Sequence, residues 1–527
     1  MSNESDPKTE KPAKPVRRFG TGVLSLLQVA CVTVLFAAAN YLGSQHYIPK
    51  DLSADAAYTL SSATQRYLQS PEVRNRAEPV RLLLAFRRNS PIAERVRALG
   101  EEYKRLSDGK VKLELLDPVR SPDRTQQVAK EYGEVFRTSF NKSMFTSDLA
   151  IVDARTAEQK QASLTEEAAG NASSHVHFIE AERMMRYETE FKGENSQRKI
   201  TGFLGEDAIT TGIVSALEGK PRKVYLLADK SGFNGEGAES PLANFESTLL
   251  SQNAVTMRAR ISGIDRIPDD VAAVAIVNPT YDFTPQELEV LMEYWERPKS
   301  SLLITLGGTD TPPRLRAFLR NVGITPRKDR VISQKGDQVH TDVRANFTAG
   351  MEFTQDFARK TTIFEGSTSS LEIREKDNED LTSKGIRPYV LIETGNDFWG
   401  ETKFSTAKPT FDPREDNPGP LSIAGAVIRG AANRDDLSER ISRMVVVANS
   451  DFLAPKYFSD INKDFLASSV NWLIGRESLA GTGPRTLGSY KLPLLDSQIA
   501  FINRVNWIFL PAFGALIAGL VWSSRRA

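Results

Sequence analysis

Cysteine is nearly absent from this chain of 527 residues, which contains one, Cys31. A single cysteine forms no intramolecular disulfide and supplies neither a redox pair nor a set of thiolate metal ligands. The charges are balanced, with 68 basic and 67 acidic residues, so the chain has no strong field that would attract nucleic acid. We therefore expect neither cysteine chemistry nor nucleic-acid binding.

Signatures of cofactor binding and nucleophilic catalysis are also missing. The sequence has no phosphate loop and no Gly-x-Ser-x-Gly elbow, and Gly307-Gly308 lacks the longer glycine fingerprint of dinucleotide sites. Only four histidines occur. In a strand, His175 and His177 would share one face and could bind a metal, whereas their loop-like surroundings favour a solvated surface pair. The sequence predicts no cofactor, no metal and no enzymatic activity.

Two apolar segments lie at opposite ends of the chain, at 20–42 and 505–522. A membrane-spanning helix needs roughly 20 predominantly apolar residues, and both segments are flanked on their outer side by arginine or lysine. This pattern predicts two spans in a bacterial inner membrane, with both termini cytoplasmic and the body periplasmic. A cleaved signal peptide is the alternative for the first segment, because Ala37-Ala38-Ala39 would allow cleavage.

Small residues recur at a spacing of four in the second segment, at Gly514 and Ala518 and at Ala515 and Gly519. Such spacing allows close packing of membrane helices, although glycine and alanine are common in membrane helices in any case.

Composition and hydrophobic patterning divide the rest of the chain into two α/β domains. The expected organisation is a disordered cytoplasmic tail at 1–19, a thioredoxin-like domain at 51–202, a doubly wound domain at 203–480 with an insertion near 331–420, and a linker at 481–504.

The first domain shows a strand, helix and strand order. Apolar runs at 79–86 and 111–116 enclose a helical pattern at 91–107, and 148–153 supplies another strand. From Phe178 onward the chain reads as a charged, helix-like stretch. The order is that of a thioredoxin-like unit without its cysteine pair.

The second domain alternates strands and helices. Its expected strands are apolar at consecutive positions, as in strands buried on both faces. They are 223–228, 271–277, 301–306 and 444–448. This alternation predicts a doubly wound parallel sheet, which the insertion would either extend or cover at its edge.

Three carboxylates, Asp229, Asp310 and Asp451, follow the carboxyl ends of these strands. Ligands of such sheets bind at this edge, so converging carboxylates could hold a cation or a polar ligand. The alternative is that they only terminate strands and cap helices.

The order of several segments resembles the GldG-like family of auxiliary components of ABC-type transport systems, some of them associated with gliding motility. The segments that carry the resemblance are Tyr58-Thr59-Leu60-Ser61, Leu116-Asp117-Pro118, Gly205-Glu206-Asp207-Ala208-Ile209-Thr210, Val277-Asn278-Pro279, Ala448-Asn449-Ser450-Asp451-Phe452 and Val470-Asn471-Trp472-Leu473. The chain departs from many relatives after the first strand of the second domain, where Gly-His-Gly-Glu is replaced by Asp229-Lys230-Ser231-Gly232.

This resemblance implies a membrane-anchored, non-enzymatic binding or scaffold subunit of an ABC-type transport system. Its partners would be a permease, a cytoplasmic ATPase and the lipid bilayer, with a homo-oligomer also possible. The resemblance also implies a glutamine-amidotransferase-like second domain, a fold shared with an intraflagellar-transport component. The alternative function is a membrane-tethered periplasmic hydrolase or glycan-binding protein that uses strand-end carboxylates.

Overall fold

The computed structural model divides the chain into two compact units, Met1–Tyr58 and Thr59–Ala527. The residues described are 18–45, 59–162, 174–192, 195–233, 237, 239–308, 310–336, 338–358, 360–376, 379–404, 409–430, 441–479, 487–488, 501 and 503–524. The expected tail at 1–19 and linker at 481–504 lie almost entirely outside them. In the first unit the chain forms one helix, α1 (Arg18–Gln45).

The expected membrane spans are not supported. Within the part of the chain that the structure describes, no helix combines the length and the apolarity needed to cross a bilayer. At about 1.5 Å per residue, the 15 residues of α15 (Leu510–Ser524) fall short of a hydrocarbon layer of about 30 Å. The preceding η6 (Val505–Phe509) is a π-helical segment. In the segment 20–42, the side chains described are those of 27–38, 40 and 41.

Predictions that depended on the spans are corrected with them. These are the transmembrane helix at each end in the expected fold class, the location in an inner membrane and the placement of the termini and the body on opposite sides. The close packing predicted for Gly514, Ala515, Ala518 and Gly519 stays a prediction.

The first α/β sheet has the strand order β2-β1-β3-β4. Its strands are β1 (Val80–Ala85), β2 (Val111–Leu116), β3 (Leu149–Asp153) and β4 (Val176–Glu180). β1 and β2 are parallel, whereas β3 is antiparallel to both β1 and β4. A βαβ unit is therefore followed by two antiparallel strands.

Helices cover both faces of this sheet. They are α2 (Ser62–Gln69), α3 (Pro71–Arg74), α4 (Ala93–Leu106), α5 (Pro122–Phe140), α6 (Ala157–Ala162) and α8 (Gly205–Glu218). Val128 and Phe136 of α5 pack with Leu83 of β1 on one face. Ile209 and Ile213 of α8 share a core with α4 on the other.

A long antiparallel hairpin replaces the helix expected after Phe178. After β4 and the turn η1 (Ala181–Met184), β5 (Met185–Lys192) pairs with β6 (Asn195–Phe203). β22 (Leu487–Gly488) adds to this ribbon. The prediction failed because the charged residues of this stretch have no helical apolar period, and pairing between the two neighbouring strands of the hairpin decided the structure.

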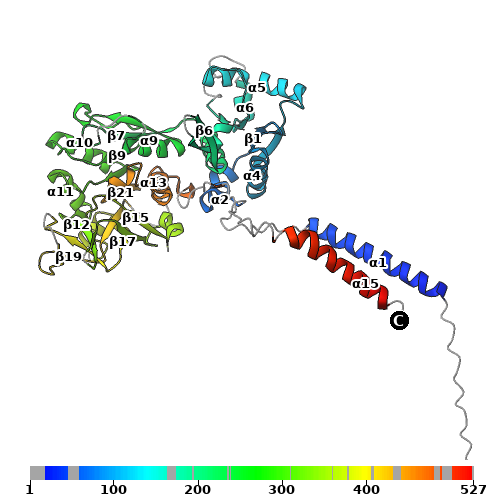
Figure 1. Ribbon diagram of the computed structural model, residues 1–527. Helices are drawn as coiled ribbons and strands as arrows, with labels where there is room; N and C mark the ends of the chain where they lie inside the picture. The colour runs from blue at the N-terminus through cyan, green and yellow to red at the C-terminus, as the bar shows by residue number, and fades with distance from the viewer. Residues whose placement is uncertain are drawn as a thin grey trace, which may run out of the picture. The chain divides into compact units, whose positions relative to one another are not determined.

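The second sheet is mixed, which corrects the expected doubly wound parallel sheet. β21 (Ser442–Val447), β10 (Ser301–Thr305), β9 (Val271–Val277), β7 (Arg222–Leu227) and β8 (Ala254–Ala259) are parallel in this order. The antiparallel strands β20 (Ser422–Arg429), β17 (Ile386–Thr394), β14 (Val343–Phe347) and β15 (Thr361–Phe364) extend it beyond β21. In Figure 1, β21 from late in the chain lies in one sheet with the earlier strands β9 and β7, and β10 separates β21 from β9.

Two helical layers enclose this sheet. α9 (Pro241–Ser251) and α13 (Asp460–Leu473) contribute Phe245 and Phe465 to one core. α10 (Pro285–Glu296) and α11 (Pro313–Asn321) contribute Leu291 and Leu315 to the other. The shorter helical segments are η2 (Ile261–Gly263), η3 (Glu352–Phe357), α12 (Glu379–Ser383), η4 (Asp451–Leu453) and η5 (Glu477–Leu479).

The insertion contributes strands to two sheets. β11 (Ile324–Pro326) and β16 (Leu371–Ile373) pair with each other, and β16 also joins β20. A separate small sheet contains β12 (Arg330–Lys335), β13 (Gln338–His340), β18 (Phe398–Glu401) and β19 (Asn417–Pro418). Of the two arrangements expected for the insertion, it therefore extends the main sheet.

Candidate functional site

The strand-end carboxylates bind separate segments of the chain. Asp229 accepts the backbone N–H groups of Ile261 and Ser262, at 3.1 and 3.3 Å, at the start of η2. Asp310 is exposed and pairs with Lys328 at 2.8 Å. Each therefore has the structural role of terminating a strand or fixing a loop.

Asp451 belongs to a different contact, in which it holds a loop of the insertion. Its carboxylate accepts the backbone N–H of Ser367 at 2.8 Å. Among the described residues no group of three or more His, Cys, Asp or Glu side chains could hold a metal ion. The expected convergence of Asp229, Asp310 and Asp451 on one ligand thus has no counterpart in their contacts.

Residues 365–370, which we call the covering segment, lie over the carboxyl ends of β10 and β21. The amide group of Asn449, directly beyond β21, donates to the carbonyl of Glu365 at 3.0 Å and to the hydroxyl of Thr368 at 2.8 Å. The backbone N–H of Ser369 donates to the carbonyl of Ala448 at 3.1 Å. Since Asn449 is fully buried, these bonds form inside the protein.

Glycine permits the closest approach between the covering segment and the sheet. An ideal Cβ at Gly308, three residues beyond β10, would lie 1.9 Å from the Cβ of Ser367. At its far end the segment is held by Asp329, which accepts the backbone N–H and hydroxyl of Ser370 at 2.8 and 2.6 Å. The carboxyl ends of β10 and β21, which form part of the edge where open α/β sheets bind ligands, are therefore covered here by the chain itself.

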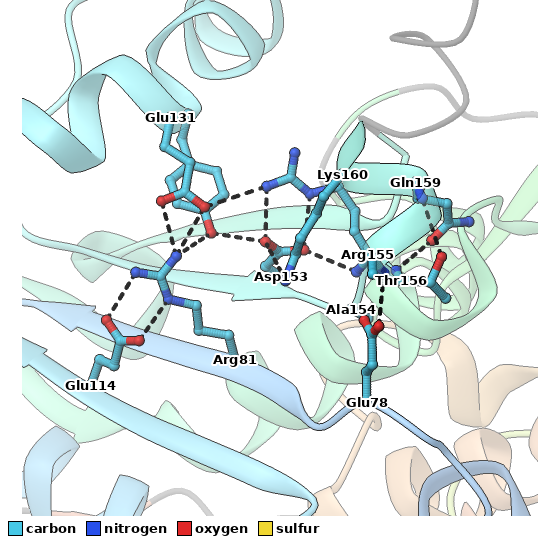
Figure 2. Close-up of polar contacts among 12 residues, drawn as sticks. Glu78, Arg81, Glu114, Glu131, Asp153, Ala154, Arg155, Thr156, Gln159 and Lys160 are labelled. Atoms are coloured by element: carbon cyan, nitrogen blue, oxygen red, sulfur yellow. Dashed lines mark hydrogen bonds and ion pairs between the residues drawn. The ribbon is translucent and has the colours of Figure 1, made fainter. Parts of the chain in front are cut away.

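A second polar arrangement, which the sequence reasoning missed, lies between α5 and the first sheet (Figure 2). We call it the charged network. Arg81 of β1 binds both carboxylate oxygens of Glu114 at 2.9 Å and both of Glu131 at 3.0 Å. It also donates to the hydroxyl of Tyr132 at 2.8 Å. The hydrogen bonds from Arg81 hold the pKa of Glu114 below its usual value, so this carboxylate stays ionised.

The buried end of the charged network is formed by Asp153 and Arg155. Asp153 receives three hydrogen bonds from Arg155, at 2.8 to 3.0 Å, and one from the Tyr132 hydroxyl at 2.8 Å. Burial by itself raises the pKa of Asp153, but the bonds from Arg155 and Tyr132 outweigh it and lower the pKa. Because every carboxylate of the network already has partners, it fixes α5 on the sheet and leaves no free acid or base.

The sequence held a weak signal for this network. Arg81 interrupts an otherwise apolar buried strand, and Asp153 ends the apolar run of β3. A charge in such a position almost always has a partner when buried. Sequence alone does not identify that partner, because Glu131 and Tyr132 come from a helix packed across the sheet.

The two histidines considered for metal binding serve the packing of the first domain. Nδ1 of His175 lies 2.7 Å from the carbonyl oxygen of Ala216 in α8. His177, in β4, is half-buried, and its burial, with a smaller effect from Arg183, lowers its pKa to about 4.

This shift predicts acid sensitivity. Between pH 6.5 and 4 the unfolded chain binds a proton at His177 that the folded chain does not, so stability falls as the pH falls through this window. His177→Gln should reduce the loss of unfolding free energy between pH 7 and 4 by about 2 to 3 kcal/mol, measured by urea unfolding at each pH. His340→Gln, on the exposed strand β13, is the control. An unchanged pH slope in His177→Gln would contradict the assignment.

Comparison with known proteins gives a partial match at the level of a domain. A model of a domain of unknown function, DUF7088, matches residues 54–170, which contain the charged network. No curated protein matches the chain. None of the comparisons gives evidence for the GldG-like family, for an ABC-type transporter or for gliding motility, and the last two assignments are withdrawn.

Solved structures resemble the chain loosely. The mmIFT52 N-terminal domain is 14% identical, with a TM-score of 0.33, and the match covers 48% of this chain and 96% of that chain. A ThuA-like protein from Bacteroides uniformis is 8% identical, with a TM-score of 0.27 and coverage of 49% and 92%. The exo-beta-1,4-mannosidase Op5Man5 from an Opitutaceae bacterium is 12% identical, with a TM-score of 0.25 and coverage of 52% and 39%. At these TM-scores the likenesses assign no function.

Proposed function

We propose that this chain is a binding or scaffold protein that acts without turnover at the sheet edge. The observation that carries the proposal is the covering segment. Its contacts with Asn449, Asp451 and Asp329 cover the carboxyl ends of β10 and β21, on the edge of the sheet where α/β enzymes bind their substrates. The polar groups there act as ligands for backbone of the same chain.

The order of the sequence motifs supports the same role. We retain the resemblance to the GldG-like family as a proposal, because it is carried by segments spread over most of the chain and implies a non-enzymatic subunit. The permease and the ATPase expected from the sequence form no part of this proposal.

The hydrolase alternative requires two carboxyl groups that face one scissile bond, about 5 to 9.5 Å apart. Asp229, Asp310 and Asp451 each bind a different segment, which disfavours this reading.

The proposal is tested by removing the carboxylates one at a time. In a deletion strain of the native host, Asp229→Asn, Asp310→Asn and Asp451→Asn should each restore the wild-type phenotype to within about twofold. Asp451→Asn keeps the shape of the acceptor, so it should cost roughly 1 kcal/mol of stability. Thermal unfolding of each purified variant shows whether it is folded. If Asp451→Asn is folded and abundant but fails to complement, the scaffold proposal is wrong and a ligand or hydrolase site takes its place.

A further inference from the structure

The edge strand β2 of the first sheet is open for pairing. It is the terminal strand in the order β2-β1-β3-β4. Carbonyls of Lys110 and Leu116 accept bonds from β1, at 2.8 and 3.1 Å, so the even-numbered residues of β2 face β1. The peptide groups of Leu113 and Leu115 therefore point away from the sheet, and no hydrogen bond to them occurs within the described chain. They form a free row of donors and acceptors.

One outward-facing backbone group of β2, at Val111, already has a hydrogen-bond partner. The N–H of Val111 donates to the hydroxyl of Ser107 at 3.0 Å, which leaves the carbonyl of Val111 as its free group. The free groups are thus concentrated at the centre and at the carboxyl half of β2.

The side chains of β2 divide by face. Val111, Leu113 and Leu115 lie on the α4 face, and Leu115 is 48% exposed. Lys112 and Glu114 lie on the other face, where Lys112 is exposed. The two oxygens of Glu114 are held by Arg81, and one of them also accepts a bond from Arg124 at 3.1 Å, so the carboxylate has a fixed position at the edge.

We propose that two copies of the chain pair along β2 as antiparallel strands, about a two-fold axis that passes beside Leu113. In this register Lys112 lies opposite Glu114 of the second copy, and the same pair recurs across the axis. Leu113 lies opposite its own symmetry mate, and Leu115 lies opposite Val111 of the second copy. Opposite charges and apolar side chains therefore meet on their respective faces.

Charge distinguishes this register from its neighbours. If the axis passed beside Glu114, the Glu114 side chains of the two copies would lie directly opposite each other. If it passed beside Lys112, the two Lys112 side chains would lie directly opposite each other. Like charges in this position destabilise strand pairs. A two-fold axis that passes between two residues would place each apolar side chain of one copy opposite a charged side chain of the other. An edge lysine ordinarily discourages pairing, but here the antiparallel register supplies its counter-charge.

The main-chain groups fit the same axis. Leu113 and its mate would exchange two hydrogen bonds, and each Leu115 N–H would donate to the free carbonyl of Val111 in the second copy. The Val111 N–H is not needed, since Ser107 accepts its hydrogen. The two sheets would then join into one continuous eight-stranded sheet, and the exposed side chain of Leu115 would be covered.

The first experiment measures self-association. The full-length chain and its variants are compared by sedimentation velocity over a range of concentrations, in one buffer. Lys112→Glu places a glutamate opposite Glu114 of the second copy, so the dimer dissociation constant should rise roughly 10- to 100-fold. Lys130→Glu makes the same charge change at an exposed position of α5 and should leave the constant unchanged. A monomeric wild-type chain, or equal effects of both variants, would overturn the proposal.

The second experiment tests the register. In a Cys31→Ser background, Leu113→Cys puts two thiols directly opposite each other, with an expected Cα separation of about 5.5 Å, which a disulfide can bridge. Mild oxidation should convert this variant into a covalent dimer. Leu115→Cys lies opposite Val111 and should cross-link at least tenfold more slowly. Faster cross-linking through Leu115→Cys, or through Glu114→Cys, would show that the proposed register is wrong. Thermal unfolding under reducing conditions verifies that each variant is folded.

Discussion

Replacing Arg476 with alanine is expected to lower the free energy of unfolding by about 3 to 5 kcal/mol. Arg476 is buried and binds Glu218 at the end of α8 through two nitrogens, one of them at 2.7 Å. It also donates to the carbonyls of Gln252 and Asn253. Its removal leaves Glu218 as a half-buried charge with fewer partners, at the point where the two α/β domains of the second unit meet.

This loss is measured by urea unfolding followed by tryptophan fluorescence. The matched control is Lys328→Ala, which breaks the exposed ion pair with Asp310 and should cost at most about 1 kcal/mol. Glu218→Gln keeps the side-chain shape, and its loss of unfolding free energy should lie between those of the other two variants. Comparable losses for Arg476→Ala and Lys328→Ala would show that the domain junction does not depend on this ion pair.

Asp153→Ala should cost a similar amount, about 3 to 5 kcal/mol at pH 7. The substitution leaves the buried Arg155 guanidinium without its main partner and the Tyr132 hydroxyl without its acceptor. Because the folded pKa of Asp153 is lowered, its contribution is present above the unfolded value of about 3.9 and is lost as the pH falls through the folded value.

The stability gap between wild type and Asp153→Ala should therefore be full at pH 7 and should shrink below about pH 4. Unfolding curves at a series of pH values measure it. Asp380→Ala, which removes an exposed ion pair with Arg374 in the second domain, is the control and should change stability by at most about 1 kcal/mol. A gap that is constant between pH 7 and 3 would contradict an ionised Asp153 in the charged network.

Local signals predicted the individual elements well. Ser61 caps α2 by accepting the N–H of Thr64, as its position before an apolar pattern predicts. Thr284 and Pro285 begin α10, with a capping box that includes Glu287. The continuous apolar runs of β9 and β10 became strands buried on both faces. These features depend on residues that are close together in the chain, so the sequence alone predicts them.

The contacts of the candidate site could not be predicted in this way. The sequence placed Asp229, Asp310 and Asp451 at strand ends, but it gave no sign that residues 365–370 of the insertion would return to cover β10 and β21. The charged network was hidden for the same reason, because Arg81, Glu131 and Asp153 come from separate elements. Side-chain partners across such sequence distances depend on packing.

The sequence by itself determined the helices and strands with strong periodicity, the lack of cysteine and phosphate-loop chemistry, and the α/β character of both domains. Only the tertiary structure decided that the second sheet continues as antiparallel strands, that the ligand edge is covered and that β2 is left open. It also overturned the two membrane spans, because no helix among the described residues is both long enough and apolar enough to cross a bilayer. The physical reason for the division is that local structure follows from short-range propensity, whereas sheet order and burial follow from contacts between segments far apart in the chain.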